Sequence, residues 1–108
     1  MKYLSRADEI LLLAILRLSE NAYGVTIIKE IQKRTGKKLT FGGLWVSLDN
    51  LCKRGFLNKT IADPTPERGG RGKIYYNLTS HGIKALEDVR NLESTLWEDI
   101  PSILSKTI

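Results

Sequence analysis

The chain has 108 residues, of which 42% are hydrophobic and 27% are charged, and its formal net charge is +5. This length suits one domain with one core, and the composition excludes a disordered or collagen-like chain. Cys52 is the single cysteine, which excludes an internal disulfide and a cysteine-cluster metal site.

No segment suggests a membrane or an export pathway. The longest apolar run, at 10–16, is far shorter than the roughly 20 residues that a membrane-spanning helix requires. The first residues lack the basic flank and small-residue cleavage site of a signal peptide. No expected helix pairs a basic face with an exposed apolar face, so we expect no binding to a membrane surface. We therefore expect a cytoplasmic protein.

The positive charge is concentrated in the middle of the chain. Residues 29–73 hold eleven basic and four acidic side chains and therefore carry a net charge of +7. The segment before them is neutral, and the segment after them is negative. This concentration predicts a polyanionic partner. A solvated basic surface without a partner is the alternative.

The first expected helix spans residues 6–19 and has Ser5 as its cap. Its middle is apolar on every face, which predicts burial on more than one side. A chain this short covers only part of such a helix. We expect the remainder to meet a second subunit or the C-terminal helix.

Two further helices follow in close succession. The second is expected at about 24–35, where Gly36 favours a left-handed stop. Thr40 is a suitable N-cap for a third helix that runs to about Arg54, with leucines at spacings of four and three marking its buried stripe. The short link at 36–39 gives this pair the dimensions of a helix-turn-helix.

A hairpin is expected after the third helix. Residues 56–62 are typical of a strand, and 74–78 of its antiparallel partner. Prolines and glycines keep the intervening loop, 63–73, out of regular structure. The loop forms a basic hairpin tip, or wing, with three cations: Arg68, Arg71 and Lys73.

Thr79 caps a last long helix that is expected to run to about Glu98. Pro101 either begins a separate final turn or kinks the helix. The elements together predict a mainly α fold with a small two-stranded antiparallel β wing. We interpret 1–79 as a winged helix-turn-helix domain and 80–108 as a C-terminal dimerisation helix, within one compact unit.

The third helix begins unusually. Gly42 and Gly43 are poor helix formers, and each costs about 1 kcal/mol relative to alanine. They are explained if the backbone closely approaches a partner such as a phosphate. A frayed first turn, or tight packing on the second helix, is the alternative. Trp45 either donates its indole N–H to a phosphate or is half-buried in the core.

These motifs resemble the PadR family of transcriptional regulators. The family has a Tyr-Gly pair at the start of the second helix, matched here by Tyr23-Gly24, and a small-Thr-Leu-Tyr-Pro-x-Leu core in the third helix, matched by 42–48. Its wing leads into Tyr-Tyr-x-Leu-Thr-x-x-Gly, matched within 69–82. The resemblance covers nearly all of 8–90. This chain departs from the pattern at three positions: Gly43 for threonine, Trp45 for tyrosine and Val46 for proline.

The resemblance implies a sequence-specific regulator that binds double-stranded DNA through its third helix and wing. Base edges in the major groove lie within reach of the first half of such a helix. The residues expected around the groove are Lys37, Lys38, Thr40, Gly43, Trp45 and Ser47. Asn50 is a candidate for reading adenine. Arg68, Arg71 and Lys73 are expected to reach phosphates or the minor groove.

The resemblance also implies a homodimer that acts as a repressor on an inverted-repeat operator. One half-site buries little surface, so such a reader needs two copies. The residues expected at the dimer interface or effector site are Leu12, Ile15, Leu86, Val89, Leu96 and Trp97. Trp97 is a candidate to stack a small planar hydrophobic ligand that releases the DNA. Plain interface packing, or a last helix folded onto its own domain, is the alternative.

An enzyme is not expected. His81 and Cys52 have no clear carboxylate partner, and the sequence has no Ser-His-Asp, Walker or HExxH pattern. We expect no cofactor and no metal. The alternative function is a winged-helix module for protein–protein interaction without DNA binding. The basic segment at 29–73 favours DNA over this alternative.

Overall fold

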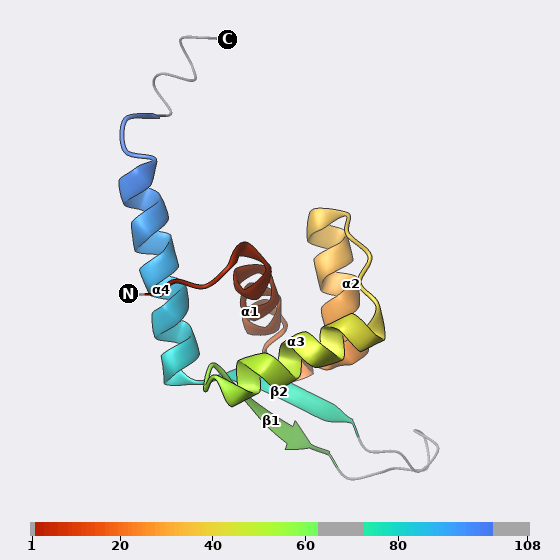
Figure 1. Ribbon diagram of the computed structural model, residues 1–108. Helices are drawn as coiled ribbons and strands as arrows, with labels where there is room; N and C mark the ends of the chain where they lie inside the picture. The colour runs from red at the N-terminus through yellow and green to blue at the C-terminus, as the bar shows by residue number, and fades with distance from the viewer. Residues whose placement is uncertain (1, 63–72, 101–108) are drawn as a thin grey trace.

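The computed structural model describes residues 2–62 and 73–100 (Figure 1). Its elements in chain order are α1 (Arg6–Leu18), the 3₁₀ turn η1 (Ser19–Asn21), α2 (Gly24–Thr35), α3 (Phe41–Lys53), β1 (Leu57–Ile61), β2 (Ile74–Leu78) and α4 (Ser80–Leu96). The three N-terminal helices pack together beside the hairpin, and α4 extends away from it (Figure 1). The predicted fold class is confirmed: the protein is a mainly α winged helix-turn-helix with a two-stranded antiparallel sheet.

The helices begin and end where local chemistry predicts. Ser5, Thr40 and Thr79 each occupy an N-cap, and each side-chain oxygen accepts a hydrogen bond from the backbone N–H three residues further on. Such caps satisfy donors that the first turn of a helix leaves unpaired. Gly36 ends α2 with a φ of 76°, in the left-handed region that favours glycine.

The core is built from the inward faces of the first three helices and the hairpin. Leu57 and Tyr76 contribute from the two strands, and Val89 contributes from α4. The largest fully buried side chains are Leu12, Ile15, Ile27, Leu48 and Leu51. The leucine stripe predicted for the third helix is therefore confirmed.

The burial of α1 corrects one expectation. Leu12 and Ile15 are 0% and 1% exposed within a single chain, so they are core residues and have no surface to offer a second subunit. The reason is that α2, β2 and α4 all pack against α1 and cover these positions. Leu13 and Leu16 form the exposed apolar face of this helix instead.

The hairpin holds a fixed register between α3 and α4. Leu57 pairs with Leu78 at the open end, next to α3 and α4, and Ile61 pairs with Ile74 toward the tip. The strands are predicted within one residue of their observed bounds. The tip itself, 63–72, with the predicted contacts Arg68 and Arg71, lies outside the described residues, as does Pro101.

A tight joint connects the turn after α3 to the start of α4. The Thr79 N–H donates to the carbonyl of Phe56 over 3.0 Å, and the Thr79 hydroxyl donates to the carbonyl of Gly55 over 2.6 Å. The His81 ring stacks on the Phe56 ring with 4.8 Å between centroids. A β-carbon at Gly82 would overlap the Phe56 carbonyl oxygen. Glycine at position 82 therefore allows the two turns to meet.

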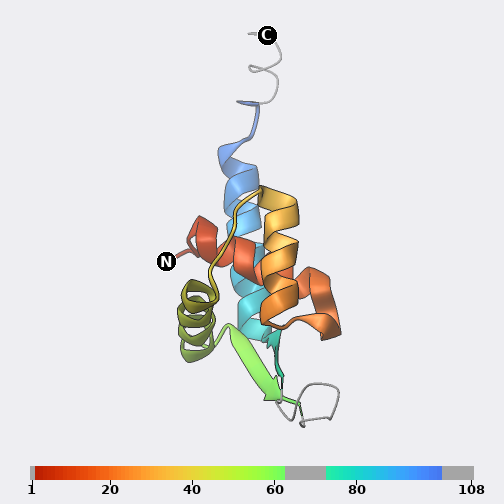
Figure 2. The same cartoon turned by 90° about the vertical axis from the view of Figure 1, so that its right-hand side faces the viewer.

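Only part of the apolar stripe of α4 is covered by its own chain. Val89 is buried and Leu86 is half-buried, whereas Ile83, Leu96 and Trp97 are exposed. Figure 2 shows the far end of α4 extending beyond the other helices. The end of this helix therefore presents apolar side chains without a partner among the described residues.

No helix in the described part of the chain has the length and apolar character needed to cross a membrane. Within 2–62 and 73–100, no cluster of histidine, cysteine and acidic side chains is arranged to hold a metal ion.

Candidate nucleic-acid interface

Helix α3 is open to solvent along its outer side, with a groove on each flank. The first groove, of about 410 Å³, lies between α3, the first half of α1, the end of α2 and the turn that joins α2 to α3. Its lining includes five of the side chains or backbone positions predicted to face DNA: Lys37, Lys38, Thr40, Gly43 and Ser47. The sequence-predicted residues before and within the first half of α3 therefore gather on one flank of that helix.

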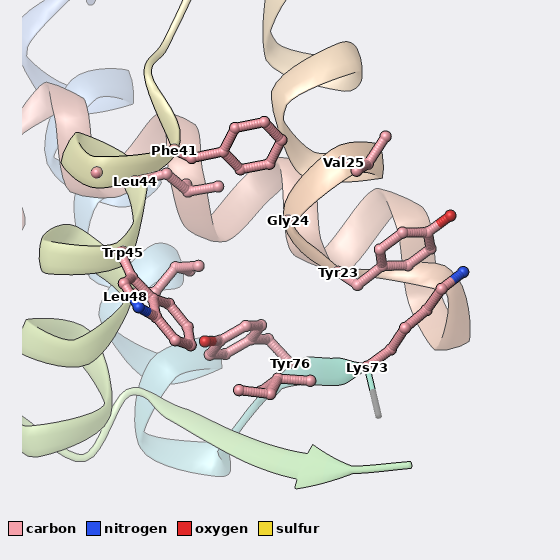
Figure 3. Close-up of a pocket in the computed structure, with 11 residues that line it drawn as sticks. Tyr23, Gly24, Val25, Phe41, Leu44, Trp45, Leu48, Lys73 and Tyr76 are labelled. Carbon is pink, nitrogen blue, oxygen red and sulfur yellow. The ribbon is translucent and has the colours of Figure 1, made fainter. Parts of the chain in front are cut away.

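The second groove, of about 610 Å³, lies on the opposite flank of α3, between it, the start of α2 and β2 (Figure 3). Two predicted residues, Trp45 and Lys73, line it, with Tyr23, Phe41 and Tyr76. The Lys73 ammonium lies 4.1 Å from the centroid of the Tyr23 ring, a cation–π contact. Lys73 therefore stands at the base of the wing, beside the second groove.

The cations around α3 differ in what surrounds them. Lys37 and Lys38 are exposed and form no ion pair with any residue in 2–62 or 73–100. The Lys37 N–H donates to the Thr35 hydroxyl over 3.1 Å, which fixes the backbone of the turn. Three other cations are paired with carboxylates, Arg34 with Glu30, Lys53 with Asp49 and Arg54 with Asp8. The turn before α3 thus holds two cations that no described carboxylate compensates.

Asn50 stands apart from the other predicted contacts. It lies in the later part of α3, and its side-chain oxygen accepts a hydrogen bond from Arg54 over 3.1 Å. The same Arg54 group donates to Asp8 over 2.9 Å. This network engages one of the two amide atoms that bidentate pairing with adenine would use.

Trp45 is partly a surface residue and partly a cover for the core. It is 53% exposed, and its indole lies beside the hydroxyl end of Tyr76 (Figure 3). Tyr76 is 3% exposed, and burial raises its pKa to about 12. The packing of the indole beside Tyr76 agrees with the half-buried interpretation of Trp45, and the phosphate contact by its N–H stays a prediction.

The surroundings of Gly42 and Gly43, at the start of α3, show whether packing requires glycine at either position. A β-carbon at Gly42 would meet nothing within 4 Å, so packing on α2 does not require glycine there. At Gly43 the β-carbon would meet the hydroxyl of Thr40 at 3.1 Å. The Thr40 cap is formed, so the first turn is not frayed. Packing against the second helix is therefore not the reason for either glycine.

A family comparison supplies the deciding observation. The model of the transcriptional regulator PadR-like family matches residues 12–88. The chain belongs to this family.

Solved structures share the PadR-like fold at low sequence identity. A PadR family transcription regulator from Clostridium difficile R20291 is 23% identical, with a TM-score of 0.63, 93% of this chain covered and 96% of that one. A PadR-like transcriptional regulator from Bacillus cereus is 18% identical, with a TM-score of 0.71 and coverages of 91% and 90%. F93 from STIV, a winged-helix DNA-binding protein, is 22% identical, with a TM-score of 0.66 and coverages of 88% and 95%. No curated protein matches the chain.

The PadR-like match spans the winged helix and the first half of α4, and it confirms the resemblance expected from the motifs. The structure supplies a reason for the most specific motif. In the block that ends at Gly82, Thr79 caps α4 and the glycine permits contact with Phe56. The motif therefore encodes the joint between the wing and α4.

Two exposed residues of α3 are absent from the sequence-predicted contacts. Phe41 is 63% exposed and Val46 is 71% exposed, although both are apolar. Their signal in the sequence is that neither falls on the leucine stripe that marks the buried side of the helix. They belong with Trp45 to the apolar face of this PadR-like helix, defined here as Phe41, Trp45 and Val46.

Proposed function

We propose that this PadR-like protein is a sequence-specific regulator that binds double-stranded DNA with α3 in the major groove. The observation that carries the proposal is that α3 is uncovered on its outer side and flanked by cations on both edges. Lys37 and Lys38 stand on one edge and Lys73 on the other. A helix presented in this way has the diameter and the charge that a major groove between two phosphate strands accepts.

The phosphate contacts in this proposal come from the turn before α3 and from the wing. Lys37 and Lys38 form no ion pair with a described residue and lie beside the N-terminus of α3, where the helix dipole also favours an anion. Lys73 directly follows the part of the wing loop that contains Arg68 and Arg71. Contacts of this kind set orientation and affinity, and they make binding strongly dependent on salt.

We further propose that the protein acts as a homodimeric repressor on an inverted repeat. The support is exposed apolar surface on two helices. Leu96 and Trp97 at the end of α4 have no partner among the described residues, and Leu13 and Leu16 are exposed on α1. Exposed apolar surface of this kind typically marks an interface. A dimer would double the phosphate contacts and give the two-fold symmetry that an inverted repeat matches.

The effector in this proposal is a small planar hydrophobic molecule that stacks on Trp97. The indole is 51% exposed at the end of α4, so a planar molecule can reach it. In this proposal it lies at or near the two-fold axis of the dimer. A ligand there would act by changing the spacing of the two α3 helices. Release of the DNA by an effector depends on this ligand site. DNA binding itself does not depend on it and can be tested separately.

The decisive experiment is selection of bound sequences from random duplex DNA at a stated salt concentration. We expect an enriched inverted repeat whose half-sites are one helical turn apart, or a multiple of it. A gel shift with the promoter of the protein's own gene provides a second test. Failure to enrich any duplex at low salt would refute DNA recognition and favour a protein-interaction module.

A further inference from the structure

The solvent side of α3 is unusually poor in polar groups where a recognition helix meets base edges. The apolar face, Phe41, Trp45 and Val46, occupies the first two turns of the helix. Gly42 and Gly43 are exposed between these residues and add no side chain. The part of α3 nearest to a bound groove therefore offers apolar surface and bare backbone.

The polar groups of α3 lie further along the helix and are partly engaged. Asp49 pairs with Lys53 over 3.0 Å, and Asn50 accepts from Arg54 over 3.1 Å. Ser47 is exposed on the flank that faces the first groove. The first two turns of α3, all of them described, contain no arginine or lysine. Arginine and lysine are the residues that most often recognise guanine, so the first two turns of α3 lack the usual side chains for contacting this base.

The major groove has one apolar feature, the 5-methyl group of thymine, which apolar side chains contact. We propose that the apolar face of α3 reads thymines through their 5-methyl groups, with Val46 and Phe41 as the residues that determine specificity. This inference rests on the proposed function, because it names which bases the DNA-binding surface selects.

The charges around the apolar face favour DNA as its occupant. Lys37 and Lys38 lie on one flank of α3, in the groove that Thr40, Gly43 and Ser47 also line. Lys73 lies on the other flank, in the groove that Phe41 and Trp45 line. An apolar strip between two cationic edges matches a groove floor between two phosphate strands. An apolar protein partner would gain nothing from these cations, which it would have to leave exposed or pair with acidic groups.

The test uses the full-length protein and the duplex obtained by selection. Each thymine of a half-site is replaced in turn by uracil, which removes the methyl group and leaves base pairing unchanged. We expect the affinity to fall about fourfold for each contacted methyl, which corresponds to losing the burial of one methylene-sized group. The loss should be confined to thymines in the major groove segment occupied by α3. Uracil at flanking positions provides the control.

A pair of variants connects the effect to the apolar face. Val46→Ala should weaken binding to the thymine duplex. At one thymine position, replacement by uracil should no longer lower the affinity of this variant. Lys37→Ala should weaken binding to the thymine and uracil duplexes by the same factor, because it removes a phosphate contact. Val46 is exposed and alanine favours helix, so circular dichroism should show unchanged folding.

The outcomes separate this inference from the proposed function. If selected DNA is bound but no uracil replacement changes the affinity, thymine reading is refuted and DNA binding stands. If Val46→Ala leaves both affinities unchanged, the apolar face serves another partner, such as a protein, and the inference fails. If no duplex is bound specifically, the proposed function itself fails.

Discussion

Gly82 and Phe56 are so close that position 82 has no room for a side chain on the side of the Phe56 carbonyl. That carbonyl cannot retreat freely, because it also accepts the hydrogen bond from the Thr79 N–H. Among the described glycines, only Gly36 and Gly55 have a positive φ angle. Gly82 therefore has a backbone conformation that other residues also adopt. Glycine is therefore required at position 82 by packing.

The first prediction follows from this close approach. Gly82→Ala should lower the free energy of unfolding by about 1–3 kcal/mol, because the added methyl must displace backbone. Urea denaturation at one fixed protein concentration measures the effect. Gly42→Ala is the matched control and should raise stability by about 0.5–1 kcal/mol, because its β-carbon meets open space in a helix. Equal effects of the two changes would contradict the packing argument.

A second prediction concerns the wing. The double change Arg71→Glu and Lys73→Glu should weaken binding to every duplex, because phosphate contacts carry no sequence information. The slope of log affinity against log salt should become flatter by roughly 0.9 for each phosphate that the variant no longer neutralises. Lys84→Glu is the control, since Lys84 lies on α4 and pairs with Asp88 over 2.6 Å. An unchanged slope in the double variant would exclude wing contact.

The third prediction addresses self-association. Leu96→Asp should shift the protein toward monomer in sedimentation equilibrium at roughly tens of micromolar, because a charge would be buried in an apolar interface. Val46→Asp introduces the same charge at an exposed apolar position on α3 and should leave the oligomeric state unchanged. A wild-type protein that sediments as a monomer would remove the basis for the dimer.

Tyr76 gives a prediction about alkaline pH. Burial raises its pKa to about 12, above the ordinary value of 10, so folding favours the neutral phenol. The stability that this provides is present below pH 10 and declines as the pH rises from 10 toward 12. The difference in unfolding free energy between wild type and Tyr76→Phe should be flat up to about pH 9 and should then fall as the pH approaches 12. If the unfolding free energies of the two proteins follow parallel curves up to pH 12, the fold does not oppose ionisation of Tyr76.

The fifth prediction isolates the effector site. The chain has two tryptophans, so Trp45→Phe leaves Trp97 as the only indole reporter. Its fluorescence should be quenched by planar aromatic compounds that stack on it. The control is Trp97→Ala, in which the remaining Trp45 emission should not respond. No response of Trp97 across a broad panel would leave it as a packing residue.

Much of the fold is predictable from local signals in this chain. Ser5, Thr40 and Thr79 cap helices because short hydroxyl side chains satisfy free N–H groups, and this depends only on neighbouring residues. Gly36 ends α2 for an equally local reason. Element bounds therefore follow from the sequence to within a few residues.

The positions that could not be predicted depend on contacts between distant segments. An apolar pattern shows that α1 is buried on several sides, but it does not show which sides the same chain covers. The pattern therefore predicts an interface role for Leu12 and Ile15, which lie in the core, and does not single out Leu13 and Leu16, which are exposed. The candidate site shows a related limit. The leucine stripe indicates that Val46 lies off the buried side of its helix, but only the packing of the other segments shows that it is 71% exposed.

The joint at Thr79 has a mechanical consequence. Its bonds to Gly55 and Phe56 fasten the end of α3 to the beginning of α4. Because α3 also packs against α2 and β1, a tilt of α4 that is transmitted through this joint would reorient the winged helix as one body and would move α3 with it.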